Sequence, residues 1–117
     1  MVRDGGVRNL IATWPYDPHA DHQATAHVAA AVAKITRTRL LFYAVWGWLL
    51  PAEEFLPITK IDGSRLNVTL HTRQKWRALL AHTSQYTDMI ADDPDGFRLP
   101  SDLFAVAERD YEVFLEG

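Results

Sequence analysis

Residues 9–48 carry the pattern that decides the fold, NLIATWPYDPHADHQATAHVAAAVAKITRTRLLFYAVWGW. The apolar run Asn9 to Trp14, which precedes Pro15, predicts a buried strand that ends at a loop. Arg39 to Trp48 is continuously apolar and aromatic, as is typical of a strand covered on both faces of a sheet. Two strands joined by a helix form a parallel pair with a right-handed crossover, so we expect an α/β fold.

The segment between these strands predicts a helix. Gln23 to Ile35 is rich in Ala, and its apolar residues at helical spacing are Ala24, Val28, Ala31, Val32 and Ile35. Asp21 precedes this run and is a candidate N-cap. The small side chains indicate a helix that packs closely against a sheet.

The rest of the chain predicts shorter elements. Residues 58–70 alternate apolar and polar side chains around Asp62-Gly63, which favours a hairpin or a strand near a sheet edge. Thr72 to Gln85 has helical spacing, Leu103 to Val106 predicts one or two helical turns, and Tyr111 to Leu115 predicts a terminal strand or helix end. We expect residues 1–117 to form a single domain.

Composition excludes several classes of function. The net charge is −3 and the 12 Lys and Arg residues are scattered, which argues against a nucleic-acid interface. The chain has no cysteine, so any metal must be held by His, Asp or Glu. Met1 to Asn9 lacks the apolar segment of a signal peptide, and the longest apolar runs are too short to span a membrane. We expect a cytoplasmic protein.

Asp17-Pro18-His19-Ala20-Asp21-His22 is the strongest candidate for a site. It lies between the end of a predicted strand and the start of a predicted helix, where open α/β sheets place their ligands. A neutral imidazole ligates zinc, and a nearby carboxylate fixes its tautomer. A loop that ends in an Asp N-cap with incidental His neighbours explains the same pattern. His27 is five residues from His22, about 140° round a helix, and is expected at the surface.

Two other places could contribute to a binding site. Trp46 and Trp48 fall on one face of the predicted strand, where they either stack on a sugar ring or pack in the core. His82 and Gln85 are one helical turn apart and either reach the site or cap the helix end.

Trp14, Asp17 and residues 19–24 resemble the second metal-site motif of PIG-L/LmbE-type zinc-dependent N-deacetylases, a Trp followed by a His-Pro-Asp-His segment that opens an Ala-rich helix. Ala20 stands where the family usually has Pro. Further matches follow in the family's order: Val45-Trp46-Gly47-Trp48, Lys75 to Gln85, Asp95-Gly96-Phe97 and Arg109 to Phe114. The resemblance covers nearly the whole chain and implies the carboxy-terminal half of a Rossmann-like three-layer fold.

The resemblance also implies roles for three residues. His22 would be a zinc ligand, His19 the electrophile or general acid beside the scissile amide, and Asp21 the carboxylate that orients His19. In such a site zinc polarises the acetamide carbonyl and activates a water molecule. The implied reaction removes an acetyl group from an N-acetylglucosamine-like sugar or amino-sugar conjugate and leaves a free amine.

The family's other metal-site motif, Ala-His-Pro-Asp-Asp-Glu, has no match in the sequence. In the family it supplies the remaining His and Asp ligands and the base, so we expect an incomplete enzyme. Without the preceding strands, the strand at residues 9–13 becomes an exposed apolar edge, and self-association is expected. The alternative function is a non-catalytic α/β binding or interaction module derived from the same fold.

Overall fold

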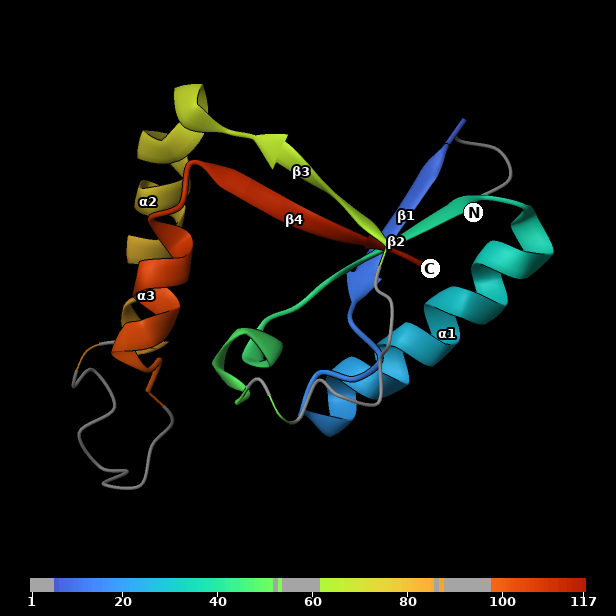
Figure 1. Ribbon diagram of the computed structural model, residues 1–117, viewed down its shortest axis with the longest axis horizontal. Helices are drawn as coiled ribbons and strands as arrows, with labels where there is room; N and C mark the ends of the chain where they lie inside the picture. The colour runs from blue at the N-terminus through green and yellow to red at the C-terminus, as the bar shows by residue number, and fades with distance from the viewer. Residues whose placement is uncertain (1–5, 52, 54–61, 86, 88–97) are drawn as a thin grey trace. The chain divides into compact units, whose positions relative to one another are not determined.

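The described part of the chain forms a four-stranded mixed sheet with three α-helices (Figure 1). This computed structural model describes residues 6–51, 53, 62–85, 87 and 98–117. The strands are β1 (Asn9–Thr13), β2 (Arg39–Tyr43), β3 (Gly63–Asn67) and β4 (Tyr111–Glu116), and the α-helices are α1 (Ala20–Thr36), α2 (Thr72–Leu80) and α3 (Ser101–Ala107). Short 3-10 helices are η1 (Trp46–Leu49), η3 (Thr69–His71) and η4 (Thr83–Gln85). The chain divides into unit 1, Met1–Leu66 with Val113–Gly117, and unit 2, Asn67–Glu112.

The strand order in the sheet is β1-β2-β4-β3. β1 and β2 are parallel, with Asn9 opposite Arg39 and Thr13 opposite Tyr43, and α1 connects them. The predicted parallel strand-helix-strand unit is therefore confirmed. β2 and β4 are antiparallel, with Phe42 opposite Leu115, which makes the sheet mixed.

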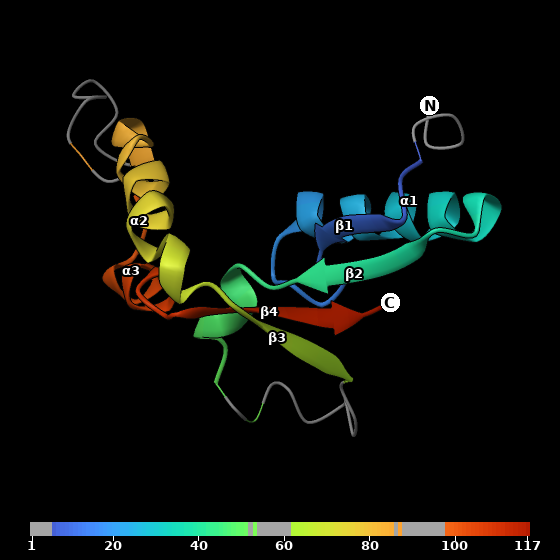
Figure 2. The same cartoon turned by 90° about the horizontal axis from the view of Figure 1, so that it is seen from above.

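The core of unit 1 lies between α1 and one face of β1 and β2 (Figure 2). Ala26, Ala29 and Ala33 of α1 are buried there, and their partners are Ala12, Trp14, Leu40 and Phe42. Alanine side chains let the helix backbone approach the sheet closely, as the sequence predicted. The predicted stripe is nevertheless not the buried face, because Val28 is 64% and Ile35 68% exposed. Ala and Val side chains occupy most of the surface of α1, so the spacing of apolar residues did not indicate which face is buried.

β2 ends at Tyr43, so the predicted strand from Arg39 to Trp48 is too long. Trp46, Gly47 and Trp48 lie in η1 instead. The N–H groups at the start of η1 bond to a buried carboxylate from the loop after β1, which explains why the chain leaves the sheet here. The two Trp residues therefore do not share a strand face.

An exposed ion pair links β2 to β4. The Arg39 guanidinium bonds to the Glu116 carboxylate. The hydrogen bond to Glu116 and its negative charge raise the pKa of Arg39 above its ordinary value. Both side chains are exposed, so solvent screens the pair and it adds little to stability.

β3 is an edge strand, as residues 58–70 predicted, but it spans only Gly63–Asn67. The hairpin alternative depends on residues 58–61, which lie outside the described residues, as does the family match at residues 95–97. Leu70 is in η3 and is 88% exposed. The alternation of apolar and polar residues therefore extends past the end of β3 and did not mark where the strand ends.

Unit 2 is built mainly from α2 and α3. α2 ends at Leu80, earlier than predicted, and η4 follows it. Trp76 of α2 and Phe104 of α3 pack edge to face with ring centroids 6.0 Å apart. The Lys75 ammonium bonds to the Glu112 carboxylate (2.6 Å) and to the Arg109 carbonyl (3.1 Å). Residues 111–116 form strand β4, so the strand alternative for this segment is the one observed.

Candidate functional site

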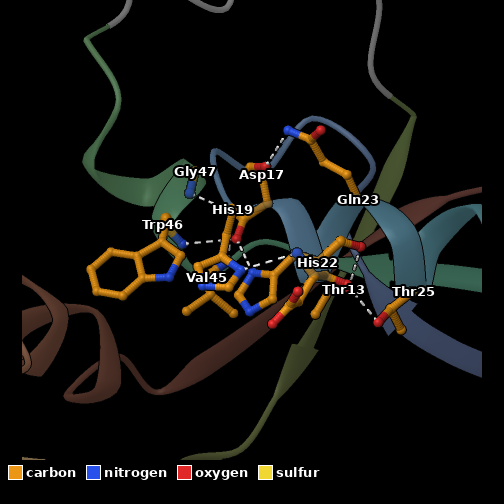
Figure 3. Close-up of polar contacts among 10 residues, drawn as sticks. Thr13, Asp17, His19, His22, Gln23, Thr25, Val45, Trp46 and Gly47 are labelled. Carbon is orange, nitrogen blue, oxygen red and sulfur yellow. Dashed lines mark hydrogen bonds and ion pairs between the residues drawn. The ribbon is translucent and has the colours of Figure 1, made fainter. Parts of the chain in front are cut away.

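The segment 17–22 lies where two parallel strands end. Trp14 N donates to the Tyr43 carbonyl (2.8 Å), so the loops after β1 and β2 leave the sheet side by side. In Figure 3, side chains from the loop after β1 and the first turn of α1 face the backbone of residues 45–47. The carboxyl ends of parallel strands are the usual ligand-binding edge of an open α/β sheet.

Asp17 is the centre of this arrangement and is fully buried. Its Oδ1 accepts hydrogen bonds from Val45 N (3.1 Å) and Gly47 N (2.5 Å), and its Oδ2 accepts one from Trp46 N (3.2 Å). Three successive backbone N–H groups that converge on one carboxylate compensate a negative charge that burial would otherwise penalise. Asp17 thereby fixes the start of η1 against the loop after β1.

The loop that carries Asp17 is held by its own backbone. Asp17 N donates to the Trp14 carbonyl (3.1 Å), and His19 N donates to the Asp17 carbonyl (2.7 Å). The same Asp17 carbonyl also accepts from Gln23 Nε2 (3.0 Å), which lies one turn into α1. These bonds fix the Asp17 carboxylate relative to both β1 and α1.

Gly47 leaves room for this carboxylate. A Cβ atom at Gly47 would lie 3.0 Å from Trp14 Cε3 and 3.1 Å from Asp17 Oδ1. Both neighbours are buried, so neither can move away freely. A residue without a side chain at position 47 thus lets the η1 backbone approach Asp17.

His22 is the second partner of Asp17. Its Nδ1 bonds to Asp17 Oδ2, and its side chain is 23% exposed. A carboxylate can only accept, so Nδ1 is the donor and carries the proton. In the neutral imidazole this leaves the lone pair on Nε2, where it can bind a metal ion or a proton.

His19 lies beside His22, but its Nδ1 accepts a hydrogen bond whereas Nδ1 of His22 donates one. Their ring centroids are 4.7 Å apart, with the planes tilted by 33°. His19 is the N-cap of α1, and its Nδ1 accepts a hydrogen bond from Asp21 N (3.2 Å). Because Nδ1 accepts, the neutral ring carries its proton on Nε2 and can donate from there. One imidazole of the pair thus offers an acceptor at Nε2 and the other a donor.

Asp21 is exposed in the first turn of α1 and is not the N-cap that the sequence predicted. His19 takes that position because its backbone is extended (φ −145°, ψ 125°) and its ring nitrogen reaches the Asp21 N–H. Asp21 therefore contacts His19 through its backbone. Within the described part of the chain, no hydrogen bond joins the Asp21 carboxylate to the His19 ring. His27 is exposed, as expected.

The role of Asp17 is the feature that sequence reasoning missed. Asp17 appeared only as a motif residue, whereas it pairs with His22 and binds the backbone of η1. A charged residue in the loop after a buried strand was the available signal, but its partners at positions 45–47 are about 30 residues away in the sequence. His82 and Gln85 belong to unit 2 and Asp17 to unit 1.

A catalytic zinc ion needs about three protein ligands. Among the described residues, no group of three His, Asp or Glu side chains could hold a metal ion. The site supplies one oriented imidazole with a carboxylate behind it, which fits one ligand position and its supporting partner.

Neither the helices nor the comparisons with known proteins indicate a function for this chain. Across the described residues, no helix is long and apolar enough to cross a membrane. No protein-family model, curated protein or solved structure matches the chain. A functional hypothesis therefore depends on the geometry around Asp17 and on the motif resemblance.

Proposed function

We propose that this chain is part of a zinc-dependent N-deacetylase with a Rossmann-like three-layer α/β fold, and that it supplies one zinc ligand and one proton donor. The observation that carries the proposal is the contact between His22 Nδ1 and the buried Asp17 carboxylate. The substrate would be an N-acetylglucosamine-like sugar or amino-sugar conjugate, as the motif resemblance implies.

His22 is suited to be the zinc ligand. Metal-bound histidines usually donate their second ring N–H to a carboxylate or carbonyl, which fixes the tautomer and the ring orientation. Asp17 provides such an acceptor, and it cannot rotate because three backbone N–H groups also bind it. Nε2 of His22 is then presented for coordination without a search among tautomers or rotamers.

His19 is suited to be the proton donor. Its Nδ1 accepts from Asp21 N, so Nε2–H is available to the substrate. A donor beside the metal ligand can hydrogen bond to the oxygen that becomes negative during amide hydrolysis, or give a proton to the leaving amine. Asp21 helps to orient His19 through its backbone amide rather than its carboxylate.

Zinc, when bound, would polarise the amide carbonyl and activate water. His22 would hold it together with ligands from outside the described residues. The carboxylate base would also come from outside the described residues. In this proposal His22 binds zinc, Asp17 orients His22, and His19 donates a proton or a hydrogen bond to the substrate.

The second candidate function is a non-catalytic α/β binding or interaction module. The observation behind this alternative is that the Asp17 carboxylate already binds three backbone N–H groups of residues 45–47. In it, Asp17 and His22 only join the loop after β1 to η1.

Zinc titration of the chain labelled with 15N at histidine separates the two functions. Long-range 1H–15N correlation spectra should show His22 as the Nδ1–H tautomer and His19 as the Nε2–H tautomer. Zinc should shift Nε2 of His22 far more than either nitrogen of His27. His27 is the internal control because it is exposed on the same helix.

Calorimetric measurement of zinc affinity in substituted chains tests the same two functions. We expect His22→Ala to abolish zinc binding and His27→Ala to leave it unchanged. Asp17→Asn should weaken zinc binding about 10- to 100-fold, since this is the usual effect of removing a carboxylate behind a metal-bound histidine. Equal zinc affinities in the His22→Ala and His27→Ala variants would contradict the zinc hypothesis and support the binding module.

A further inference from the structure

The last residue of β1 makes a side-chain hydrogen bond to α1. Thr13 Oγ1 donates to the backbone carbonyl of His22 (2.8 Å), as drawn in Figure 3. The carbonyl can only accept, so the hydroxyl is the donor. Thr13 is 7% exposed, so water has little access to its hydroxyl, and the His22 carbonyl satisfies it instead. The bond therefore fixes the start of α1 to the end of β1.

The partner of the His22 ring is fixed to the same end of β1. Asp17 N donates to the carbonyl of Trp14 (3.1 Å), the residue that directly follows Thr13. The Asp17 carboxylate in turn bonds to His22 Nδ1. These contacts close a ring, in which the Thr13 hydroxyl is the bond that places the backbone of His22 relative to Asp17.

His22 lies in a part of α1 that the helix itself holds weakly. It is the third residue of α1, and the N–H groups of the first turn have no partner within a helix. The next residue, Gln23, begins the helical hydrogen bonding by donating from its N to the His19 carbonyl (3.1 Å). Helix ends fray. A bond from β1, which pairs with β2 along its whole length, holds this turn from outside the helix.

We propose that Thr13 is a positioning residue for His22, and that its hydroxyl keeps the imidazole against Asp17 and Nε2 directed towards a metal ion. The inference rests on the proposed function, because it concerns how His22 is held for zinc. Thr13 acts through His22 and is not itself a ligand. Asp17 cannot follow a displaced His22, since the N–H groups of residues 45–47 fix its carboxylate. A shift of the His22 backbone would therefore weaken the contact between the two side chains.

Thr25 offers a matched control for Thr13. Its Oγ1 donates to the Asp21 carbonyl (2.7 Å), also in the first turn of α1, and its side chain is exposed. Thr13→Val and Thr25→Val thus remove the same hydroxyl from the same kind of acceptor. Thr13→Ser keeps the hydroxyl and loses only a methyl group. Together the three variants separate the hydrogen bond of Thr13 from the packing of its side chain.

The effect on His22 is measured without zinc. Long-range 1H–15N spectra are recorded in mildly alkaline buffer, where imidazole is neutral. In Thr13→Val the ratio of unpaired to Asp17-paired His22 should rise about 2- to 10-fold, the factor that corresponds to one typical hydrogen bond. The two ring nitrogens should then shift towards each other, because the Nε2–H tautomer becomes populated. Thr13→Ser and Thr25→Val should keep the wild-type shifts.

Urea unfolding of the same variants separates positioning from a purely structural role. All of them should fold, and Thr13→Val should be less stable than the wild-type chain. A loss of stability in Thr13→Val with unchanged His22 shifts would mean that the hydroxyl only stabilises the fold, and the inference would be wrong. The same conclusion would follow if Thr13→Ser changed the His22 shifts as much as Thr13→Val.

Zinc calorimetry then connects Thr13 to the metal. Thr13→Val should weaken zinc binding about 2- to 10-fold, less than Asp17→Asn, and Thr25→Val should leave it unchanged. If the wild-type chain binds no zinc, the proposed function fails, while the zinc-free spectra still decide whether Thr13 positions His22. If Thr13→Val and Thr25→Val give the same spectra, the inference about Thr13 is overturned and the proposed function is unaffected.

Discussion

Asp17→Asn is the substitution with the clearest expected effect on stability. It keeps the size and shape of the side chain but replaces Oδ2 with an NH₂ group. Oδ1 can still accept from Val45 N and Gly47 N. The new NH₂ group faces the Trp46 N–H and the His22 ring, so a donor meets a donor at Trp46.

The expected loss of stability is the sum of the changes at these contacts. The bond from Trp46 N to a charged acceptor contributes ~1.5–3 kcal/mol. The bonds from Val45 N and Gly47 N change from a charged to a neutral acceptor, which costs about 1 kcal/mol each. His22 can change tautomer and accept from the new amide, so its contact adds little to the loss. The expected decrease in the free energy of unfolding is about 4 kcal/mol, a large fraction of the ~5–15 kcal/mol typical of a domain.

Urea unfolding followed by Trp fluorescence measures this decrease. Asp21→Asn is the matched control, because the same chemical change is made at an exposed residue four positions away. Its effect should be below ~1 kcal/mol, the usual contribution of a charge in the first turn of a helix. If the two variants lose the same stability, Asp17 does not anchor η1 and the reasoning fails.

Two further substitutions test the packing of unit 1. Gly47→Ala should cost ~1–3 kcal/mol, because the added Cβ would lie 3.0–3.1 Å from Trp14, Ala44 and Asp17, and thermal unfolding measures the loss. An unchanged melting temperature would contradict the close approach of η1 to Asp17. Ala26→Leu should cost a similar amount, because Ala26 is 1% exposed against the sheet, whereas Ala30→Leu on the exposed side of α1 should be nearly neutral. Equal melting temperatures for these two variants would mean that α1 does not pack through the Ala26 face.

The local elements were predictable where one physical signal dominated. Asn9–Thr13 and Arg39–Tyr43 are short apolar runs that flank a long Ala-rich segment, and both strands and the helix formed. The end of β2 was not predictable, because residues 44–48 remain apolar beyond the last strand residue. What ends the strand is the bonding of Val45–Gly47 N–H groups to a carboxylate from another loop.

The buried face of α1 was also beyond the sequence. Ala24 and Ala26 have the same side chain, yet Ala24 is exposed and Ala26 is buried. A helix with small apolar residues around most of its surface has no single hydrophobic direction. Only the position of the sheet selects Ala26, Ala29 and Ala33 as the buried residues.

By itself the sequence determined that a parallel strand-helix-strand unit exists and that the segment 17–22, which carries two Asp and two His residues, follows its first strand. These properties depend on apolar patterning and chain order, which are local. The tertiary structure alone decided that Asp17, rather than Asp21, is the carboxylate that holds a histidine, and that this histidine is His22. A hydrogen bond depends on distance and direction, and the contacts that bury and fix Asp17 come from η1, about 30 residues along the chain.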